Sequence, residues 1–527
     1  MAEHKLGQAD TLLQEGQMRR FDLEDKPVLL ARVNGQYYAT SDKCTHYGGP
    51  LHEGALRGYT VMCPWHHACF NVRSGERVEP PALNDLPHYP LRIDNGSVIV
   101  TLPHDNETNP QGKADPAVKE TIVIVGGGAA GNAAAETLRR EKFAGKIIML
   151  SAVPDLPIDR PNLSKDYLDG HAKPEWMPLR GEKWYAERDI ELRLNTRVTG
   201  IDFTAHTVST AQGDSLHYGK LLLATGAVAR QLRNTPGADL SGIYTLRSLA
   251  DADAIIQAVQ QGKRGVVIGS SFIGLEVTAA LAGGRGASIS VVAPETVPFE
   301  HTLGEEIGRM FQREHEANGV QFHLGDGVTG FTGVNGAVAK VQLKSGKTLD
   351  ADFVVVGIGV VPATDFLNAS SLTLDEKDHS VRVNSHLQSS QPDVFAAGDI
   401  ARWGEGGGTR IEHWRLAEQH GIIAAYNMLG SGDDMDAHVP FFWTTQWKIT
   451  LTYVGHATQW DEIIYRGSPE AKKFIAFYVK EGQLLAAAGC GHDQELDALE
   501  FILQAKLPLS VGQMRDSDFS LVEYAAK

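Results

Sequence analysis

Short apolar runs separated by turn residues dominate the first hundred residues of the chain. Runs at 28–30, 61–62 and 98–100 are broken by glycine, proline and asparagine. Short strands at this spacing are typical of a small all-β domain. We therefore predict an all-β domain over residues 1–105.

The pattern becomes polar over residues 104–119, which contain two prolines and a glycine. This composition favours an exposed linker, and we predict its limits as 106–119.

Two β-α-β patterns follow the linker. In the first, a continuous apolar run at 121–125 precedes three glycines, a helical stretch at 129–141 and a strand at 147–150. The second has a strand at 266–268, a helix at 272–281 and a strand at 288–292. Continuous apolar runs of this kind are typical of buried parallel strands, and the repeat predicts two doubly wound nucleotide-binding domains.

The predicted fold class is a multidomain α/β chain: an all-β domain, two Rossmann-like dinucleotide-binding domains and a C-terminal α+β domain. The C-terminal segment shows strands followed by a helix at 494–504. After the all-β domain and the linker, the predicted limits are 120–247 and 374–438 for the two parts of the first dinucleotide domain, 248–373 for the second, and 439–527 for the C-terminal domain.

Charge and composition limit the partners. A net charge of −16 argues against nucleic acid and anionic membrane surfaces. No window approaches the ~18 apolar residues of a membrane span. Residues 1–10 are polar and contain no apolar signal core. Only four cysteines occur in 527 residues, which fits a reducing compartment. We therefore expect a cytoplasmic protein without a membrane span.

Two of the cysteines belong to a metal-binding pattern. Cys44-Thr-His46 is followed by Cys63-Pro-Trp-His66, so each tight loop carries one cysteine and one histidine. Two thiolates and two imidazoles in this order match a Rieske [2Fe–2S] centre, where one iron takes both cysteines and the other both histidines. A Cys₂His₂ zinc site is the alternative, although zinc spacings usually pair like residues.

Two glycine-rich turns follow the predicted parallel strands. The first is G-x-G-x-x-G, with candidate nucleotide contacts at Gly126, Gly128, Ala129 and Gly131. Glycines there let a pyrophosphate approach the backbone and the helix N-terminus. The acidic residue expected about 20 residues on, which would bind the ribose, is missing because Ala152 and its neighbours occupy that stretch.

The second turn has Gly269, Ser271, Ile273 and Gly274 as candidate contacts. Ser271 replaces the middle glycine, and Ala293-Pro294 stands where the ribose acid is expected, with Glu295 just beyond. The alternative is a unit that packs without binding a nucleotide. These departures leave the choice between NAD and NADP open.

Two strand ends point to flavin. One is Ala224-Thr225-Gly226, and the other is Gly398-Asp399 at the end of a similar apolar run. Taken alone, each could be an ordinary strand end.

These motifs occur in the order of the glutathione-reductase-like flavoproteins. Further matches are the segments at 159–165, 272–276, 356–362, 412–414 and 440–443. The chain most resembles the ferredoxin-reductase branch, and with its N-terminal Rieske domain it resembles the Rieske-containing apoptosis-inducing-factor-like FAD/NAD(P)H oxidoreductases.

The resemblance implies roles for individual residues. Arg160 and Lys165 would contact FAD, and Asp399 would bond its ribityl chain. Lys165 and Glu276 would form the catalytic pair beside the nicotinamide. The remaining implied contacts to flavin or nucleotide are Gly357, Gly359, Glu412, His413, Trp414 and Trp443. Trp414 and Trp443 could instead be core residues, since large aromatics usually are.

The resemblance also bears on the cluster loops. High-potential Rieske proteins carry a disulfide at the positions of Gly49 and Trp65, so a lower-potential, ferredoxin-type centre is expected. His67 stands where the family usually has glycine, and its register makes it a bystander rather than a ligand. Cys69 is expected to be a buried free thiol.

The resulting functional prediction is a ferredoxin–NAD(P) reductase-type enzyme that passes electrons from NAD(P)H through FAD to its own cluster. The cluster would then pass the electrons to a protein acceptor such as a terminal oxygenase. The chain could also associate with further copies of itself as a homo-oligomer. One rival is a thiol-dependent NADH peroxidase or disulfide reductase, but residues 162–164 carry no redox cysteine. Another is a redox-gated signalling protein with slow turnover.

Two ways in which the Rieske cluster could deliver electrons to the acceptor stay open. The Rieske domain either swings on the linker between a docked pose near Trp443 and an acceptor, or stays docked.

Overall fold

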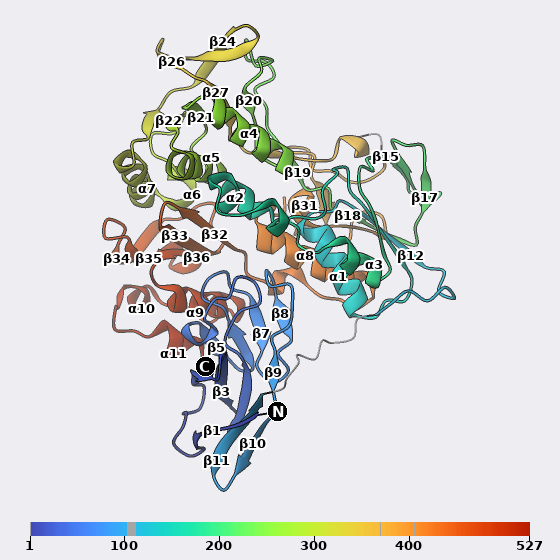
Figure 1. The fold of residues 1–527 in the computed structure, drawn as a ribbon, viewed down its shortest axis with the longest axis vertical. Helices are drawn as coiled ribbons and strands as arrows, with labels where there is room; N and C mark the ends of the chain where they lie inside the picture. The colour runs from blue at the N-terminus through green and yellow to red at the C-terminus, as the bar shows by residue number, and fades with distance from the viewer. Residues whose placement is uncertain (1, 103–111, 369, 405–406, 527) are drawn as a thin grey trace. The chain divides into compact units, whose positions relative to one another are not determined.

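The computed structural model describes residues 2–102, 112–368, 370–404 and 407–526, and Figure 1 shows their fold. The chain forms two compact units. The first contains residues 1–110, 437–443 and 451–527, and the second contains 111–436 and 444–450.

The predicted linker lies partly outside the described residues, at 106–111. The rest bonds to the second unit: the N–H of Gly112 donates to the carbonyl of Arg139 (2.8 Å), and that of Asp115 donates to the carbonyl of Ala144 (2.7 Å).

The N-terminal part of the first unit is all β, as predicted. Its three antiparallel sheets have the strand orders β1-β11-β10, β2-β3-β4-β9 and β5-β6-β7-β8. The strands are β1 (Ala2–Gln8), β2 (Met18–Leu23), β3 (Lys26–Val33), β4 (Gln36–Ser41), β5 (Ala55–Arg57), β6 (Thr60–Met62), β7 (Cys69–Asn71), β8 (Arg77–Glu79), β9 (His88–Tyr89), β10 (Leu91–Asp94) and β11 (Ser97–Leu102).

The C-terminal part of the first unit has a five-stranded sheet of order β32-β33-β36-β35-β34. Its strands are β32 (Phe441–Gln446), β33 (Ile449–Gly455), β34 (Glu462–Ser468), β35 (Lys473–Lys480) and β36 (Gln483–Cys490). Three helices follow, α9 (Asp493–Gln504), α10 (Val511–Arg515) and α11 (Leu521–Ala525). The order of strands and helix agrees with the sequence prediction.

The two parts of the first unit share one apolar core. Ala55, Met62 and Cys69 of the N-terminal β-domain belong to the same buried cluster as Phe477 and Leu496 of the C-terminal part. A second cluster around Leu51 and Phe70 lies within the β-domain itself.

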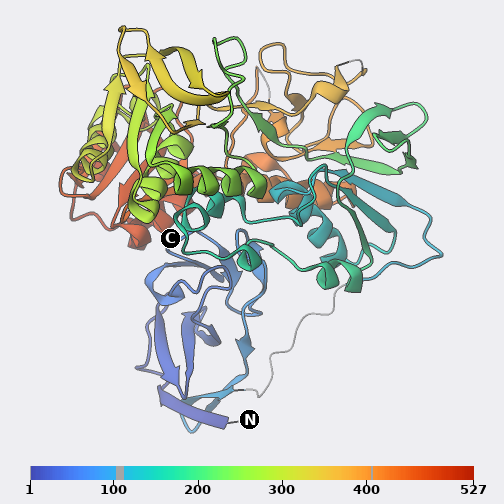
Figure 2. The ribbon, with the colours of Figure 1, turned by 45° about the horizontal axis from the view of Figure 1, so that its top comes forward.

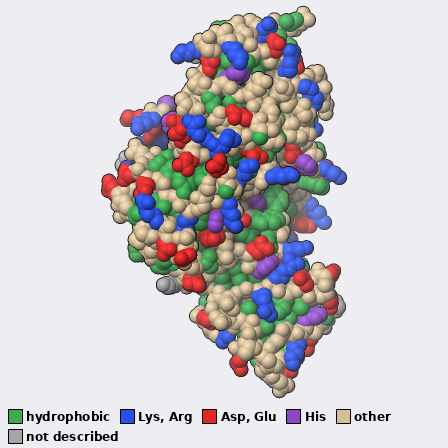
Figure 3. All heavy atoms as spheres, turned by 90° about the vertical axis from the view of Figure 1, so that its left-hand side faces the viewer, with side chains coloured by type: hydrophobic (Ala, Val, Ile, Leu, Met, Phe, Trp, Pro, Cys, Tyr) green, Lys and Arg blue, Asp and Glu red, His purple; other side chains and the backbone are tan. Residues whose placement is uncertain are grey.

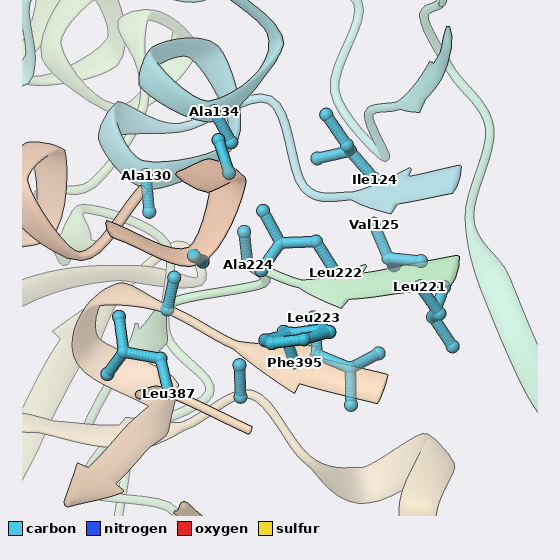
Figure 4. Close-up of a cluster of buried hydrophobic side chains, with 14 of the residues drawn as sticks. Ile124, Val125, Ala130, Ala134, Leu221, Leu222, Leu223, Ala224, Leu387 and Phe395 are labelled. Atoms are coloured by element: carbon cyan, nitrogen blue, oxygen red, sulfur yellow. The ribbon is translucent and has the colours of Figure 1, made fainter. Parts of the chain in front are cut away.

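The second unit contains two parallel sheets, the first of order β14-β13-β12-β18-β30. Its strands are β12 (Thr121–Val125), β13 (Lys146–Leu150), β14 (Ile190–Arg193), β18 (Lys220–Leu223) and β30 (Val394–Ala396). The runs of valine, isoleucine and leucine are buried on both faces, as Figure 4 shows for Ile124, Leu222 and Phe395.

Helices α1 (Ala129–Arg140) and α8 (Trp414–Met428) pack on this sheet. Small residues bring the two helices close: a Cβ on Gly421 of α8 would lie 2.2 Å from the carbonyl oxygen of Ala130 in α1. Further short helices of this region include η2 (Arg160–Ser164), α2 (Asp166–Asp169), η3 (Pro174–Trp176) and α3 (Glu182–Glu187).

The second parallel sheet has the order β20-β27-β21-β22-β23. Its strands are β20 (Ile243–Tyr244), β21 (Arg264–Ile268), β22 (Ser288–Ala293), β23 (Gln321–Leu324) and β27 (Phe353–Val356). Its helices are α4 (Leu249–Gln261), α5 (Phe272–Ala279), α6 (Glu300–Leu303) and α7 (Glu305–Ala317). The predicted helix at 272–281 is divided, because α5 ends at Ala279 and a π-helical turn (Ala280–Gly284) follows.

Smaller sheets complete the second unit, and Figure 2 shows them beside the parallel sheets. They are formed by β15 (Val198–Asp202), β16 (Thr207–Thr210) and β17 (Ser215–His217), by β24 (Val328–Val334), β25 (Ala337–Leu343) and β26 (Thr348–Asp350), by β19 (Ala227–Ala229) with β28 (Val360–Pro362), and by β29 (Val381–Val383) with β31 (Ala401–Trp403).

Acidic and basic side chains are interspersed on the face shown in Figure 3. Within the described ranges, no helix is both long enough and apolar enough to cross a membrane.

Candidate functional site

The four predicted cluster ligands lie on two loops with the same backbone pattern. In the first loop, the N–H of Gly48 donates to the carbonyl of Cys44, and the N–H of Cys44 to the carbonyl of Gly49 (both 2.9 Å). In the second, His67 and Ala68 make the equivalent bonds with Cys63, at 3.0 and 2.9 Å. The two cysteines therefore occupy equivalent loop positions, whereas His46 follows its cysteine by two residues and His66 by three.

The side chains of these loops converge in pairs. Nδ1 of His46 lies 3.1 Å from Nδ1 of His66. The Cys44 and Cys63 thiols are buried, and the hydrogen bond from Cys63 lowers the pKa of the Cys44 thiol. Burial lowers the pKa of His46 to about 4, so its ring is neutral and able to bind a metal. Among the described residues, no three Cys, His, Asp or Glu side chains surround a single metal position.

Two pairs, one of sulfur and one of nitrogen, are what the two irons of a Rieske centre require. The donor set thus fits the cluster. A Cβ on Gly49 would lie 2.8 Å from Sγ of Cys63, so glycine is needed beside the sulfur. Cys69 is a buried free thiol, as predicted.

Aromatic rings contact both histidine ligands. The Tyr47 ring lies 4.1 Å from the His46 ring, and the Trp443 ring of β32 lies 4.5 Å from the His66 ring, both between centroids. Trp443 is thus placed against a predicted cluster ligand, and its implied contact with the flavin stays a prediction.

His67 is more than the bystander that the sequence predicted. Its side chain is fully buried. Its Nδ1 lies 2.5 Å from Oε2 of Glu500, and its Nε2 lies 3.1 Å from Oδ1 of Asp497, both carboxylates belonging to α9. That it is not a ligand stays a prediction, and its contacts with these two carboxyl groups give it a structural role.

The first nucleotide turn has the geometry that its glycines predict. Gly126 has a φ of 120°, and a Cβ there would lie 2.1 Å from the carbonyl oxygen of Ala224. A Cβ on Gly131 would lie 1.9 Å from the carbonyl oxygen of Gly126. Gly128 is the N-cap of α1 and Ala129 is its first residue. The N-terminus of α1 is therefore open to an anion.

Arg160 supplies a second observation for an anion at this turn. Its guanidinium lies next to Gly128, 3.8 Å from the position of a Cβ there. Its Nε is buried and has no hydrogen-bond partner within the described part of the chain. Burial, with repulsion from Arg247, lowers the pKa of Arg160 to about 9. A pyrophosphate would satisfy this cation, so the residues fit FAD.

The other predicted flavin contacts lie at strand ends around this turn. Thr225 donates a hydrogen bond to the carbonyl of Ala363 (2.9 Å), and Gly226 has a φ of 68°. Gly398 has a φ of 77°. Asp399 pairs with Arg247 at 2.6 Å, a partner that the sequence did not suggest.

Residues 412–414 lead into α8. Glu412 pairs with Arg410 at 2.7 Å, and burial raises the pKa of Glu412 in spite of this partner. His413 is the N-cap of α8, and Trp414 is its first residue, packed partly buried against the apolar core.

The predicted catalytic pair is brought together from residues 111 positions apart. Nζ of Lys165 lies 2.8 Å from Oε2 of Glu276 in α5. Ser164 donates to the same oxygen at 2.5 Å, and Thr444 donates to Oε1 at 2.7 Å. The sequence analysis missed Thr444. Ser164 lies in the segment 159–165 that matches the family, and this match could have indicated its role.

The second nucleotide turn keeps its shape without the middle glycine. Gly269 has a φ of 107°, and a Cβ on Gly274 would lie 2.4 Å from the carbonyl oxygen of Gly269. Ser271 is the N-cap of α5: its hydroxyl donates to the carbonyl of Gly357 (2.9 Å) and accepts from the N–H of Gly274 (3.5 Å). Gly359 has a φ of 89°, and Ile273 is exposed.

Comparison with known proteins matches three regions of the chain to protein families. Residues 120–421 match the pyridine nucleotide-disulphide oxidoreductase family, residues 3–90 the Rieske [2Fe-2S] domain, and residues 441–525 the reductase C-terminal domain.

Individual relatives cover much of the chain. Apoptosis-inducing factor 3 of Homo sapiens is 37% identical over 495 residues, which is 91% of this chain and 80% of that protein. The ferredoxin–NAD(+) reductase component of the anthranilate 1,2-dioxygenase system of Burkholderia cepacia is 33% identical over 77% of this chain and 98% of its own. The ferredoxin reductase for the CYP199A2 system of Rhodopseudomonas palustris aligns with a TM-score of 0.73 and 32% identity over 77% of this chain and 100% of its own.

Proposed function

Because this chain belongs to the pyridine nucleotide-disulphide oxidoreductase family and is an FAD-dependent NAD(P)H oxidoreductase with a Rieske [2Fe–2S] domain, we propose that it passes electrons from NAD(P)H through FAD to its own cluster and then to a protein acceptor. When bound, FAD takes up a hydride and releases electrons singly, which the one-electron cluster requires.

One observation carries the proposal that the cluster belongs to the electron path. The ring of Trp443, on the first strand of the reductase C-terminal domain, lies 4.5 Å from the ring of the ligand His66. The apolar core shared by the two domains supports a lasting association of the Rieske domain with the reductase.

We propose the implied roles for the residues of the flavin and nucleotide sites. Arg160 and the N-terminus of α1 would hold the FAD pyrophosphate, and Asp399 would face its ribityl chain. Gly269, Gly274, Gly357 and Gly359 would let NAD(P)H approach the backbone. Lys165 would present a cation to the flavin, and Glu276 would hold Lys165 in position.

The acceptor is proposed to be another redox protein. The reductase relatives include the component of an anthranilate dioxygenase system, and this likeness supports an oxygenase component as the acceptor. The similarity to apoptosis-inducing factor 3 supports the second candidate, a redox-gated signalling protein. Fast steady-state turnover with an artificial acceptor would favour the reductase, and a slow, long-lived complex of reduced flavin with nucleotide would favour the signalling protein.

Anaerobic stopped-flow reduction tests the electron path. After mixing with NADH, bleaching of the flavin should precede bleaching of the cluster, and electron paramagnetic resonance (EPR) should show one reduced [2Fe–2S] centre. Trp443→Ala should slow the second phase and leave the first unchanged, whereas Trp443→Phe should restore part of the rate.

Trp460→Ala is the matched control, since that ring contacts Tyr478 rather than a ligand. A cluster that stays oxidised beside fully reduced flavin in the unmodified protein would refute the proposal.

A further inference from the structure

His67 occupies a backbone position that disfavours its side chain. The equivalent position of the other cluster loop is Gly48, with a φ of 80°, whereas His67 has a φ of 56°. Left-handed backbone favours glycine, because other residues have a Cβ that clashes there. A histidine held in this conformation indicates that its ring makes contacts that outweigh the strain.

The ring of His67 contacts α9 and β32 of the C-terminal domain. Beyond its pairs with Glu500 and Asp497 in α9, the His67 ring packs on the Phe441 ring, with centroids 4.1 Å apart. His67, Asp497 and Glu500 are called the His67 network below. Each member is at most 6% exposed at the side chain.

Asp497 extends the network to a second segment of the Rieske domain. Its Oδ2 accepts a hydrogen bond from the N–H of Ala55 (3.1 Å). Gln494, one turn earlier in α9, donates to the carbonyl of Gly54 (2.9 Å). A Cβ on Gly54 would lie 1.9 Å from the carbonyl oxygen of Met62, so the chain is tightly packed where α9 reaches it.

We propose that the His67 network locks the Rieske domain to the C-terminal domain, so that the Rieske domain does not swing away from Trp443. His67 is a positioning residue in this proposal. It follows the ligand His66 directly in the chain, so anchoring His67 to α9 holds His66 against Trp443. Leaving the docked pose would separate these buried polar groups from their partners, and a buried donor or acceptor that loses its partner is destabilising.

The test cuts the peptide chain between the Rieske domain and the rest of the complete holoprotein. A protease recognition sequence is placed within residues 103–111, the purified protein is cleaved, and gel filtration at decreasing concentration measures whether the Rieske fragment stays with the remainder. The parent fragment should co-elute at every concentration. His67→Gly should raise the apparent Kd of the fragment by about 100-fold or more. Glycine suits this backbone conformation, so the variant is expected to fold.

A second pair of variants distinguishes the network from a local effect of His67. Asp497→Asn should weaken retention from the C-terminal side. The double variant His67→Gly/Asp497→Asn should weaken it by less than the product of the two single effects, because the residues act on each other. Arg92→Gln, which removes an exposed ion pair with Glu3 inside the Rieske domain, should leave retention unchanged.

Spectroscopy of the uncleaved protein supplies the last readout. In His67→Gly the EPR signal of the reduced cluster should be unchanged, whereas reduction of the cluster after flavin reduction should slow at least about tenfold. Retention equal to the parent in His67→Gly, or loss of the cluster itself, would overturn the proposal. The slowed transfer rests on the proposed electron path, but retention of the cleaved fragment does not, so the failure of either proposal can be recognised separately.

Discussion

The Nζ atom of Lys165 lies 2.8 Å from Oε2 of Glu276, and the same carboxylate accepts hydrogen bonds from Ser164 and Thr444. The Glu276 side chain is 3% exposed and that of Lys165 is 17% exposed. A buried carboxylate with three donors has a fixed position. It therefore holds the Lys165 ammonium group in a fixed position that is partly open to solvent.

Lys165→Ala should slow flavin reduction by about 10²-fold or more and change the Kd for NAD(P)H much less, because a positioned charge that favours the reduced flavin acts mainly in the transition state. Anaerobic stopped-flow measurements over a range of nucleotide concentrations separate the two quantities. Lys183→Ala, at an exposed lysine of the same domain, is the control. Equal reduction rates in both variants would rule out the role of Lys165.

Cys44→Ser should remove the [2Fe–2S] cluster and leave FAD bound. The core around the first parallel sheet is built from residues of the second unit alone, so loss of the cluster does not reach it. Iron and flavin analysis of the purified variant, with the EPR spectrum, checks this outcome. Simultaneous loss of flavin would show that the two sites depend on each other.

Glu295 should favour NADH over NADPH. It follows β22 two residues beyond the usual position of the ribose acid, and its Oε2 accepts a hydrogen bond from Ser270 of the glycine-rich turn (3.3 Å). Residues 293–300 contain two glutamates and neither lysine nor arginine to pair with a 2′-phosphate.

Glu295→Ala should reduce kcat/KM for NADH by about tenfold, the effect of one lost charged hydrogen bond, and leave NADPH unchanged or improved. The ratio of kcat/KM for the two nucleotides is the measurement. Glu300→Ala, which removes the acceptor of the Thr296 hydroxyl, is the control. A parent enzyme that prefers NADPH would contradict the prediction.

Asp378 should control how well FAD is retained in acid. It bonds Arg402 and Arg410 at 2.7 and 2.8 Å, and Arg410 in turn donates to the carbonyl of Asp399 (3.2 Å). Burial raises the pKa of Asp378, but hydrogen bonds from Ser380 and the two guanidinium groups outweigh it and hold the pKa far below its usual value.

A carboxyl with a depressed pKa stabilises the folded state above its unfolded pKa of about 4, and that stabilisation is lost as the pH falls towards the folded pKa. Asp378→Asn should therefore lower the temperature of flavin release at pH 7, and the difference from the parent should shrink below about pH 4. Flavin fluorescence during heating at several pH values measures this. A difference that is constant with pH would contradict the assignment.

The sequence by itself determined the architecture and predicted the cluster ligands. Continuous apolar strands followed by glycine turns define parallel nucleotide-binding units, because both depend on local periodicity and on backbone conformations that only glycine adopts readily. The mixed Cys-x-His and Cys-x-x-His loops predicted Cys44, His46, Cys63 and His66 as ligands, since ligand type and spacing are themselves sequence properties. The family resemblance added Lys165 and Glu276 as a pair.

Only the tertiary structure decided which distant residues support these sites. Thr444 reaches Glu276 and Asp497 reaches His67 from positions 168 and 430 residues away, and no local pattern records such a contact. The sequence showed His67 in place of a glycine but could not show its purpose, because the value of a buried ring depends on the charges packed around it. Those charges lie on α9, which the fold brings to the second cluster loop.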